Sequence, residues 1–197
     1  MDILASVLET GETPLRARAL DAIVQLHQRQ PELRPDREML RRLLHRELKD
    51  AYQLAAVQAD TASLEAELLA EALAERRRTA LERILKLLRV LHPGKHLEVV
   101  ERNLHNPQAS ARANAVELFE QVLDNETSRC LVPLLEMANP DRLATAGDEL
   151  FPLLRREPEA WLHELLMDEH TWTVATSLDV VRRRAYPEFE GTVRLLL

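Results

Sequence analysis

Apolar residues recur at spacings of three and four along most of the chain, which is the period of an amphipathic α-helix. The clearest case is the stretch 97–135. It predicts two helices, at 97–104 and 109–123, joined by a polar corner at 105–107. No run of residues alternates with the period of two that a half-buried strand shows. The pattern therefore predicts an all-α chain.

Four helices are expected before this pair, at 2–10, 14–29 with Thr13 as its N-cap, 36–59 and 64–92. The last two exceed the average helix length of about 11–12 residues. Because a short polar corner at 60–63 joins them, we expect an antiparallel hairpin over about 36–92. A two-stranded coiled coil with another molecule is the alternative. The apolar stripes of these helices include Leu15 and Leu68, which we expect to be buried.

Further helices are predicted after residue 123. Their ranges are 127–138, 140–154, 158–167, 172–184 and 189–197. Pro133 lies inside the first of them and should kink or shorten it, because proline lacks the N–H that an inner turn donates. Gly147 weakens the second, because glycine is a poor helix former.

Three segments share one pattern of residue types: RARALD at 16–21, RANAVE at 112–117 and VATSLD at 174–179. Each has a small residue second and fourth, a branched apolar residue fifth and an acid sixth. Small residues allow close approach of helices, so the pattern predicts a repeated helix pair. Repeats of this kind bury their apolar faces by stacking in an α-solenoid. Chance similarity among Ala- and Leu-rich helices is the alternative explanation.

With these segments, the chain resembles HEAT-like repeat proteins over most of its length. The resemblance implies an α-solenoid of antiparallel helix pairs in a single domain, 1–197. Its first repeat would occupy 1–35, the long hairpin 36–92 and further repeats 93–197.

A narrower resemblance rests on the segments 82–88, 112–119 and 131–136. They are similar to the HEAT-repeat region attached to bacterial membrane transporters of the ATP/ADP-translocase-like class. That resemblance implies a soluble cytoplasmic region of a larger protein. The three leucines that end the chain, 195–197, lead us to expect a fragment of something longer.

Composition adds a few exclusions. Hydrophobic residues make up 46% of the chain, which supplies a core, and no apolar run reaches the 18 residues of a membrane span. The net charge of −7 disfavours broad nucleic-acid binding. With Cys130 as its one cysteine, the chain has neither an intrachain disulfide nor a cysteine-based metal site. We expect a cytoplasmic location.

Candidate catalytic chemistry is sparse. The four glycines are scattered, so no phosphate-binding loop is formed. His92 and His96 have the spacing of metal ligands on a helix, but Pro93 and Gly94 interrupt a helix there. We therefore expect no enzyme activity, no cofactor and no metal site.

Six residues are candidate contacts with a partner. The acids Asp21, Glu117 and Asp179 occupy the same motif position and would form an acidic stripe on a regular solenoid, or else point to water. Arg182, Arg183 and Arg184 form a basic cluster, as do the arginines at 41, 42 and 46 and those at 76–78. Such clusters are either pairs within their own helix or contacts with nucleic acid or anionic lipid.

The sequence thus predicts a non-catalytic protein-interaction or scaffold module that binds another protein or another domain of its parent chain. One alternative is a HEAT-like nucleic-acid-binding protein or DNA glycosylase, since Trp161, Trp172 and Tyr186 are near the basic cluster at 182–184. Another is a structural homo-oligomer formed through the 36–92 hairpin.

Overall fold

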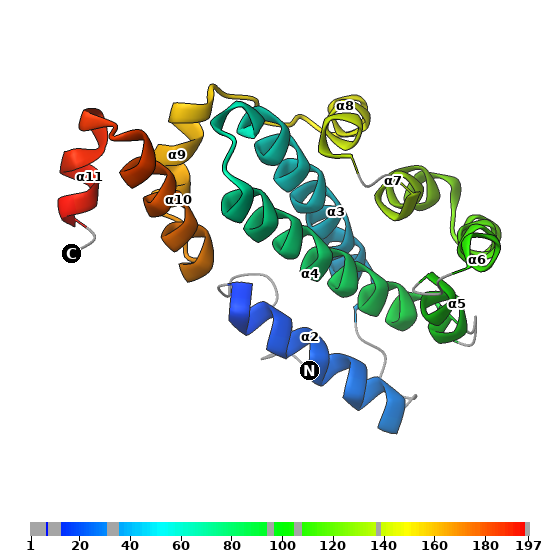
Figure 1. The fold of residues 1–197 in the computed structure, drawn as a ribbon. Helices are drawn as coiled ribbons and strands as arrows, with labels where there is room; N and C mark the ends of the chain where they lie inside the picture. The colour runs from blue at the N-terminus through cyan, green and yellow to red at the C-terminus, as the bar shows by residue number, and fades with distance from the viewer. Residues whose placement is uncertain are drawn as a thin grey trace. The chain divides into compact units, whose positions relative to one another are not determined.

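The computed structural model describes residues 13–30, 36–93, 97–104, 108–136 and 139–195, together with Val7. Over these ranges the chain forms ten α-helices and two short 3₁₀-helices, and no strand. Figure 1 shows the helices along the chain. The predicted all-α class is confirmed. Apart from Val7, the predicted helix at 2–10 lies outside the described residues.

The helices follow the apolar pattern closely. Their bounds are α2 Thr13–Arg29, α3 Arg37–Asp60, η1 Ala62–Leu64, α4 Glu67–Leu91, α5 Leu97–Leu104, α6 Ala109–Val122, α7 Asn125–Glu136, α8 Pro140–Leu150, α9 Pro158–Leu166, α10 Thr171–Arg184, η2 Pro187–Phe189 and α11 Glu190–Leu195. Pro133 lies within α7, which continues for three more residues. Among the described residues, no helix has both the length and the apolarity that crossing a membrane requires.

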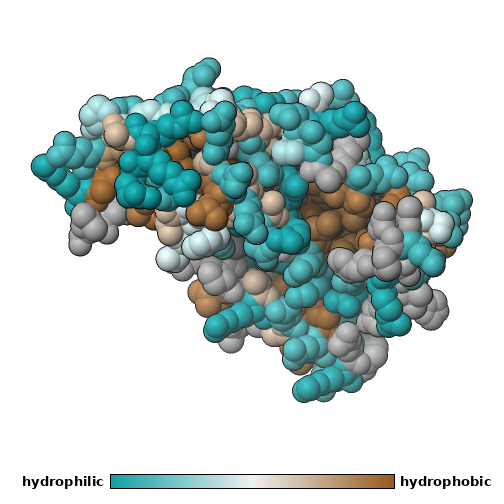
Figure 2. All heavy atoms as spheres, in the orientation of Figure 1, coloured by the Kyte–Doolittle hydropathy of each residue, from teal (hydrophilic) through white to brown (hydrophobic). Residues whose placement is uncertain are grey.

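The chain divides into two compact units. The first comprises Met1–Asp50 and Thr79–Met137, and the second Ala51–Arg78 and Ala138–Leu197. Both α3 and α4 contribute one part to each unit. On the face drawn in Figure 2, hydrophilic residues cover most of the surface and apolar areas interrupt them.

In the first unit, ion pairs connect α4 to three other helices. Arg83 of α4 lies 2.8 Å from Glu47 of α3, and both side chains are largely buried. Lys86 pairs with Asp21 of α2 at 2.6 Å, and Arg89 lies 3.6 Å from Glu101 of α5. Helix α5 also contacts α6, which contacts α7. The buried side chains between these helices are mainly aliphatic: Leu20, Ile23, Leu40, Leu44, Ile84, Leu87, Leu88, Phe119 and Leu131.

In the second unit, one apolar cluster joins α3 and α4 to the C-terminal helices. Its buried members are Val57, Leu64, Leu69, Leu73, Trp161, Leu162, Leu165, Leu166, Val180, Val181 and Phe189. Gln58 of α3 donates to the Ala70 carbonyl of α4 and accepts from Arg77 of α4. Because α3 and α4 contact each other in both units, the predicted pairing of the two long helices is confirmed at these contacts (Figure 1).

Two leucines that we expected to be buried are exposed. Leu15 is 52% exposed, because α2 packs through the neighbouring face that carries Arg16, Ala19 and Leu20. Leu68 is 42% exposed, because α4 begins at Glu67 rather than at residue 64 and its buried face starts with Leu69. Both residues lie at the first turn of a helix, at the edge of the apolar stripe.

The Asp60 carboxylate connects the end of α3 to a distant part of the chain. One oxygen accepts hydrogen bonds from Nε and Nη2 of Arg155, at 2.9 and 2.6 Å. The other accepts from the Arg156 backbone N–H at 3.1 Å and from the Trp161 indole N–H at 2.9 Å. A negative charge is unfavourable at a helix C-terminus, so these donors compensate for its position. Burial raises the pKa of Asp60, but the hydrogen bonds outweigh burial and the pKa lies below its ordinary value.

Gly147 of α8 allows a close approach to Tyr52 of α3. A Cβ atom on Gly147 would lie 2.8 Å from Cδ1 and 3.0 Å from Cβ of Tyr52, and 2.7 Å from Cδ1 of Leu153. The Tyr52 ring also packs against Phe151 with centroids 5.6 Å apart. The glycine that weakened the helix prediction is therefore a packing requirement of the second unit.

We expect Gly147→Ala to lower the free energy of unfolding by about 1–3 kcal/mol, because the added methyl group has no room. Gly191→Ala is the matched control, since a Cβ there meets nothing within 4 Å. The control should stabilise the chain by up to about 1 kcal/mol, because alanine favours helix. Urea denaturation of both variants measures the two changes, and equal effects would contradict the close approach.

We expect Asp60→Asn to lower the free energy of unfolding by about 2–3 kcal/mol at pH 7, because its amide NH₂ would face donors. Asp148→Asn, which removes an exposed 2.8 Å pair with Arg155, should cost at most about 1 kcal/mol.

The effect of Asp60→Asn should also depend on pH. Since the pKa of Asp60 is lowered on folding, its ionised form stabilises the folded chain fully well above the ordinary pKa of 3.8. That stabilisation is lost as the pH falls through the lower, folded pKa. The difference between wild type and variant in urea denaturation should therefore shrink in acid, and a constant difference would contradict the assigned cause.

Candidate functional site

The three motif acids lie in different surroundings. Asp21 is half-buried on α2 and pairs with Lys86 at 2.6 Å. Glu117 is exposed on α6. Asp179 is half-buried on α10. Because Asp21 and Glu117 belong to the first unit and Asp179 to the second, the acidic stripe stays a prediction.

The motif positions next to these acids are packed as the pattern suggests. The small fourth residue is buried in all three copies, as Ala19, Ala115 and Ser177. The apolar fifth residue is buried as Leu20 and Val116 and partly buried as Leu178. These residues therefore serve helix packing, and the acid is the motif position left to make other contacts.

All three arginines of the 182–184 cluster have partners within the chain. Arg182 and Arg183 share the carboxylate of Asp179, at 2.8 and 2.7 Å. This is the intrahelical pairing that the sequence offered as one alternative. Arg184 instead donates to the backbone carbonyls of Leu64 and Ser63, at 2.8 and 3.4 Å. A cation is favourable at these carbonyls, because they end a short helix.

The three arginines of the 76–78 cluster also differ in their partners. Arg78 pairs with Glu75 of its own helix. Arg76 reaches Asp168, between α9 and α10, at 2.8 Å, and Arg77 reaches Gln58 of α3 at 2.8 Å. Arg76 and Arg77 therefore do not form the intrahelical pairs that the sequence offered as one alternative, and instead connect α4 to other elements.

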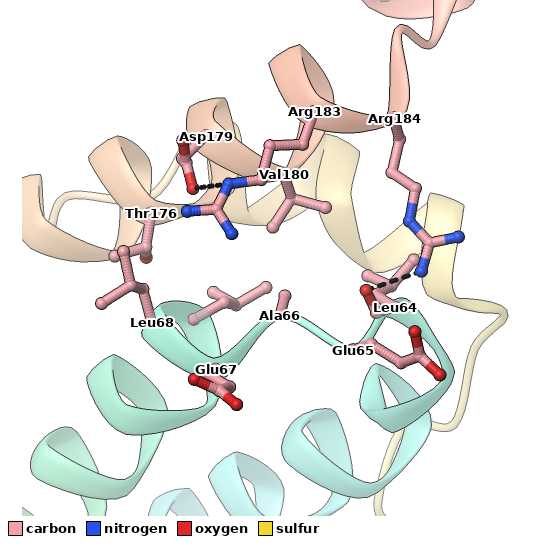
Figure 3. A pocket seen from close by; sticks show the side chains of 11 residues that line it. Leu64, Glu65, Ala66, Glu67, Leu68, Thr176, Asp179, Val180, Arg183 and Arg184 are labelled. Atoms are coloured by element: carbon pink, nitrogen blue, oxygen red, sulfur yellow. Dashed lines mark hydrogen bonds and ion pairs between the residues drawn. The ribbon is translucent and has the colours of Figure 1, made fainter.

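A hollow of about 220 Å³ lies between residues 64–69 and α10, and we call it the η1–α10 groove (Figure 3). Its apolar lining includes the buried Leu64, Leu69 and Val180, and Leu68 lies exposed at its edge. The other lining residues are Glu65, Ala66, Glu67, Thr176, Asp179, Arg183 and Arg184. Three of the six residues predicted as partner contacts thus lie together at one hollow.

Two non-glycine residues in the left-handed backbone conformation end the two elements that border the groove, η1 and α10. Glu65 has φ 49° and ends η1, with its N–H bonded to the Ala62 carbonyl. The chain then needs Ala66 before α4 begins, which separates η1 from α4. Ala185 has φ 52° and ends α10 directly after Arg184. Nothing in the amino-acid types at 65 and 185 indicates this conformation, which usually selects glycine.

Charges of opposite sign border the groove on opposite sides. Figure 3 shows Arg183 and Arg184 on the α10 side, across from Glu65 and Glu67. Both glutamates are exposed, and neither forms an ion pair with a described residue. The sequence reasoning missed Glu65, Glu67 and Leu68 as site residues, because surface acids and leucines are common on any helix.

A second hollow, of about 290 Å³, lies in the first unit between α3, the end of α4 and the start of α7. Arg37, Arg41 and His45 line one side, and Asp124 and Cys130 line another. The pKa of Asp124 is lowered, chiefly because its carboxylate accepts the Thr127 N–H at 2.8 Å. Burial raises the pKa of the Cys130 thiol, which disfavours the nucleophilic thiolate. Among the described residues, no group of three His, Cys, Asp or Glu side chains could hold a metal ion.

Comparison of the chain with protein-family models, with curated proteins and with solved structures gave no match in any of the three.

We expect Ala185→Gly to raise the free energy of unfolding by about 0.5–1 kcal/mol, because glycine adopts φ 52° without the steric cost of a Cβ. The matched control is Ala175→Gly, at an exposed position inside the same helix, which should lower it by about 1 kcal/mol. Thermal or urea denaturation measures both. Two changes of the same sign would contradict the left-handed end of α10.

Proposed function

We propose that the chain is a non-catalytic protein-interaction module built of HEAT-like helix pairs, and that it binds a protein partner at the η1–α10 groove. The observation that carries this proposal is the composition of the groove. It has a buried apolar floor, an exposed Leu68 and a charged border of both signs. An apolar centre with a polar rim is the usual anatomy of a protein–protein interface.

The packing of neighbouring helices supports the HEAT-like part of the proposal. Helix α5 contacts α6 and α6 contacts α7, while α9 contacts α10. In a solenoid each helix packs mainly on its neighbours in sequence. The buried small residues at 19, 115 and 177 add a shared packing position to three of the helices.

The ionisable groups support a non-catalytic role. A general acid that works near neutral pH needs a raised carboxyl pKa. Asp60 and Asp124 both have lowered pKa values, and each is held by donors that stabilise a helix end. Both are thus structural acids. The resemblance to transporter-attached HEAT regions extends the proposal to a soluble cytoplasmic region of a larger membrane protein.

The arginines at 182–184 favour a protein partner over nucleic acid. Arg182 and Arg183 already share a carboxylate, and Arg184 already donates to two carbonyls. A phosphate would have to compete with these internal acceptors, and the overall charge of −7 opposes it. We therefore expect a gel-shift titration with DNA or RNA at low salt to stay flat, and a salt-sensitive complex would favour the nucleic-acid alternative.

A photo-crosslinking amino acid at Leu68 tests the groove directly. Leu118 of α6 is the matched control, because both leucines are 42% exposed. We expect the probe at 68, and not the probe at 118, to form a crosslink to a protein that mass spectrometry identifies. Equal capture at both positions, or none at 68, would contradict a partner at the groove.

A further inference from the structure

We propose that the partner seated on the η1–α10 groove is a second copy of this chain, docked by two-fold symmetry. This inference rests on the proposed function, since it names the occupant of the same groove. It differs from a coiled-coil-like homo-oligomer formed along the two long helices of the 36–92 hairpin, because it assigns the contact to the corner at 64–69 together with the C-terminal end of α10.

The charges on the two sides of the groove are complementary to each other. Glu65 and Glu67 supply two negative charges on one side. On the other side, Arg183 and Arg184 line the groove, and Arg182 adjoins them on α10 outside the lining. These three arginines are opposed by Asp179 alone, which leaves two positive charges. Arg182 and Arg183 stay 75% and 60% exposed although they are paired, so they remain within reach of a further carboxylate.

In a two-fold dimer, the contact between the acidic side and the basic side forms twice. In such an interface, residue i of one copy contacts residue j of the other, and j contacts i in return. When two grooves face each other, the acidic side of each copy can lie against the basic side of the other. The two-fold rotation thus forms two acidic–basic contacts, and the second copy needs no residues other than those already at the groove.

The apolar residues fit the centre of such an interface. Leu68 is exposed beside the hollow, whose floor is formed by Leu64, Leu69 and Val180. Facing copies would place the two Leu68 side chains and the two hollows together near the axis. The apolar contacts would then form the buried centre of the interface, and the charged contacts at its rim would set specificity and orientation.

Other occupants match only part of the groove. A basic peptide would pair with Glu65 and Glu67 but would leave Arg182 and Arg183 facing its own charge. An acidic peptide would have the reverse problem. Like charges that face each other across an interface disfavour a wrong partner, so a partner that carries both signs on opposite edges fits best.

Charge exchange tests the proposal on the whole 197-residue chain. Glu65→Arg/Glu67→Arg makes both sides of the groove basic, and Arg182→Glu/Arg183→Glu makes both sides acidic. We expect wild type to show a concentration-dependent monomer–dimer equilibrium by sedimentation velocity. Each variant should weaken dimerisation at least about tenfold, because like charges then face each other.

An equimolar mixture of the two variants gives the decisive result. Basic sides then meet acidic sides at both contacts, so a heterodimer should form with an affinity within about tenfold of the wild-type dimer. Glu120→Arg/Glu136→Arg is the matched control, because it reverses two exposed acids, on α6 and α7, and should leave dimerisation unchanged. Circular dichroism of each variant verifies that it is folded. Measuring dimerisation of the wild type at rising salt is a poorer test, because salt also screens the repulsion between two chains of charge −7.

Three results would overturn the proposal: a wild-type chain that stays monomeric at all concentrations, a dimer that neither exchange weakens, or a mixture that fails to associate. Failure of self-association is distinguishable from failure of the proposed function. If the chain is monomeric while the Leu68 probe captures a different, identified protein, the groove still binds a partner and only its identity as a second copy is wrong. If the probe captures nothing, the groove itself is wrong.

Discussion

The Asp60 carboxylate connects the end of α3 to the chain that leads into α9. Asp60 ends α3, and its four hydrogen-bond donors come from the segment 155–161, about a hundred positions later in the chain. Gln53, two turns earlier on α3, adds a reciprocal pair of 2.9 Å hydrogen bonds with the backbone of Leu154. These bonds fix the extended chain between α8 and α9 against α3. They thereby fix where α9 begins, and through the apolar cluster of Trp161 they position the helices that border the groove.

The helices could be predicted because their signals are local. Spacing of apolar residues gave the bounds of α5 as the structure has them, those of α2 within one residue, and most of the other helices within a few residues. The start of α4 was missed because its signal is not local. Glu65 takes a left-handed backbone conformation without being glycine, and the Leu64 carbonyl just before it accepts a hydrogen bond from Arg184, at the far end of another helix. No pattern within the corner 60–63 records that contact.

Only the α10 side of the candidate site could be predicted from the sequence. Asp179, Arg183 and Arg184 stood out because they lie in a repeat motif or a charge cluster, and the structure brings them together at the groove. Glu65, Glu67 and Leu68 face them from a segment more than a hundred residues earlier. As surface acids and an apolar residue in a helix-like pattern, they had no distinguishing signal. The cross-helix bonds of Arg76 and Arg77 were missed likewise, since nearby acids offered simpler partners.

The close contact between Gly147 and Tyr52 restricts which side-chain sizes can occur together in this fold. The two positions share one volume, and the tyrosine ring already occupies what a side chain at 147 would need. A larger residue at 147 is therefore compatible with this fold only when the side chains at 52 and 153, which both approach the added Cβ, give way. A smaller residue at 52 beside Gly147 leaves a void. Side-chain sizes at 52, 147 and 153 should consequently change together from one chain of this fold to the next, even where no other residue is shared.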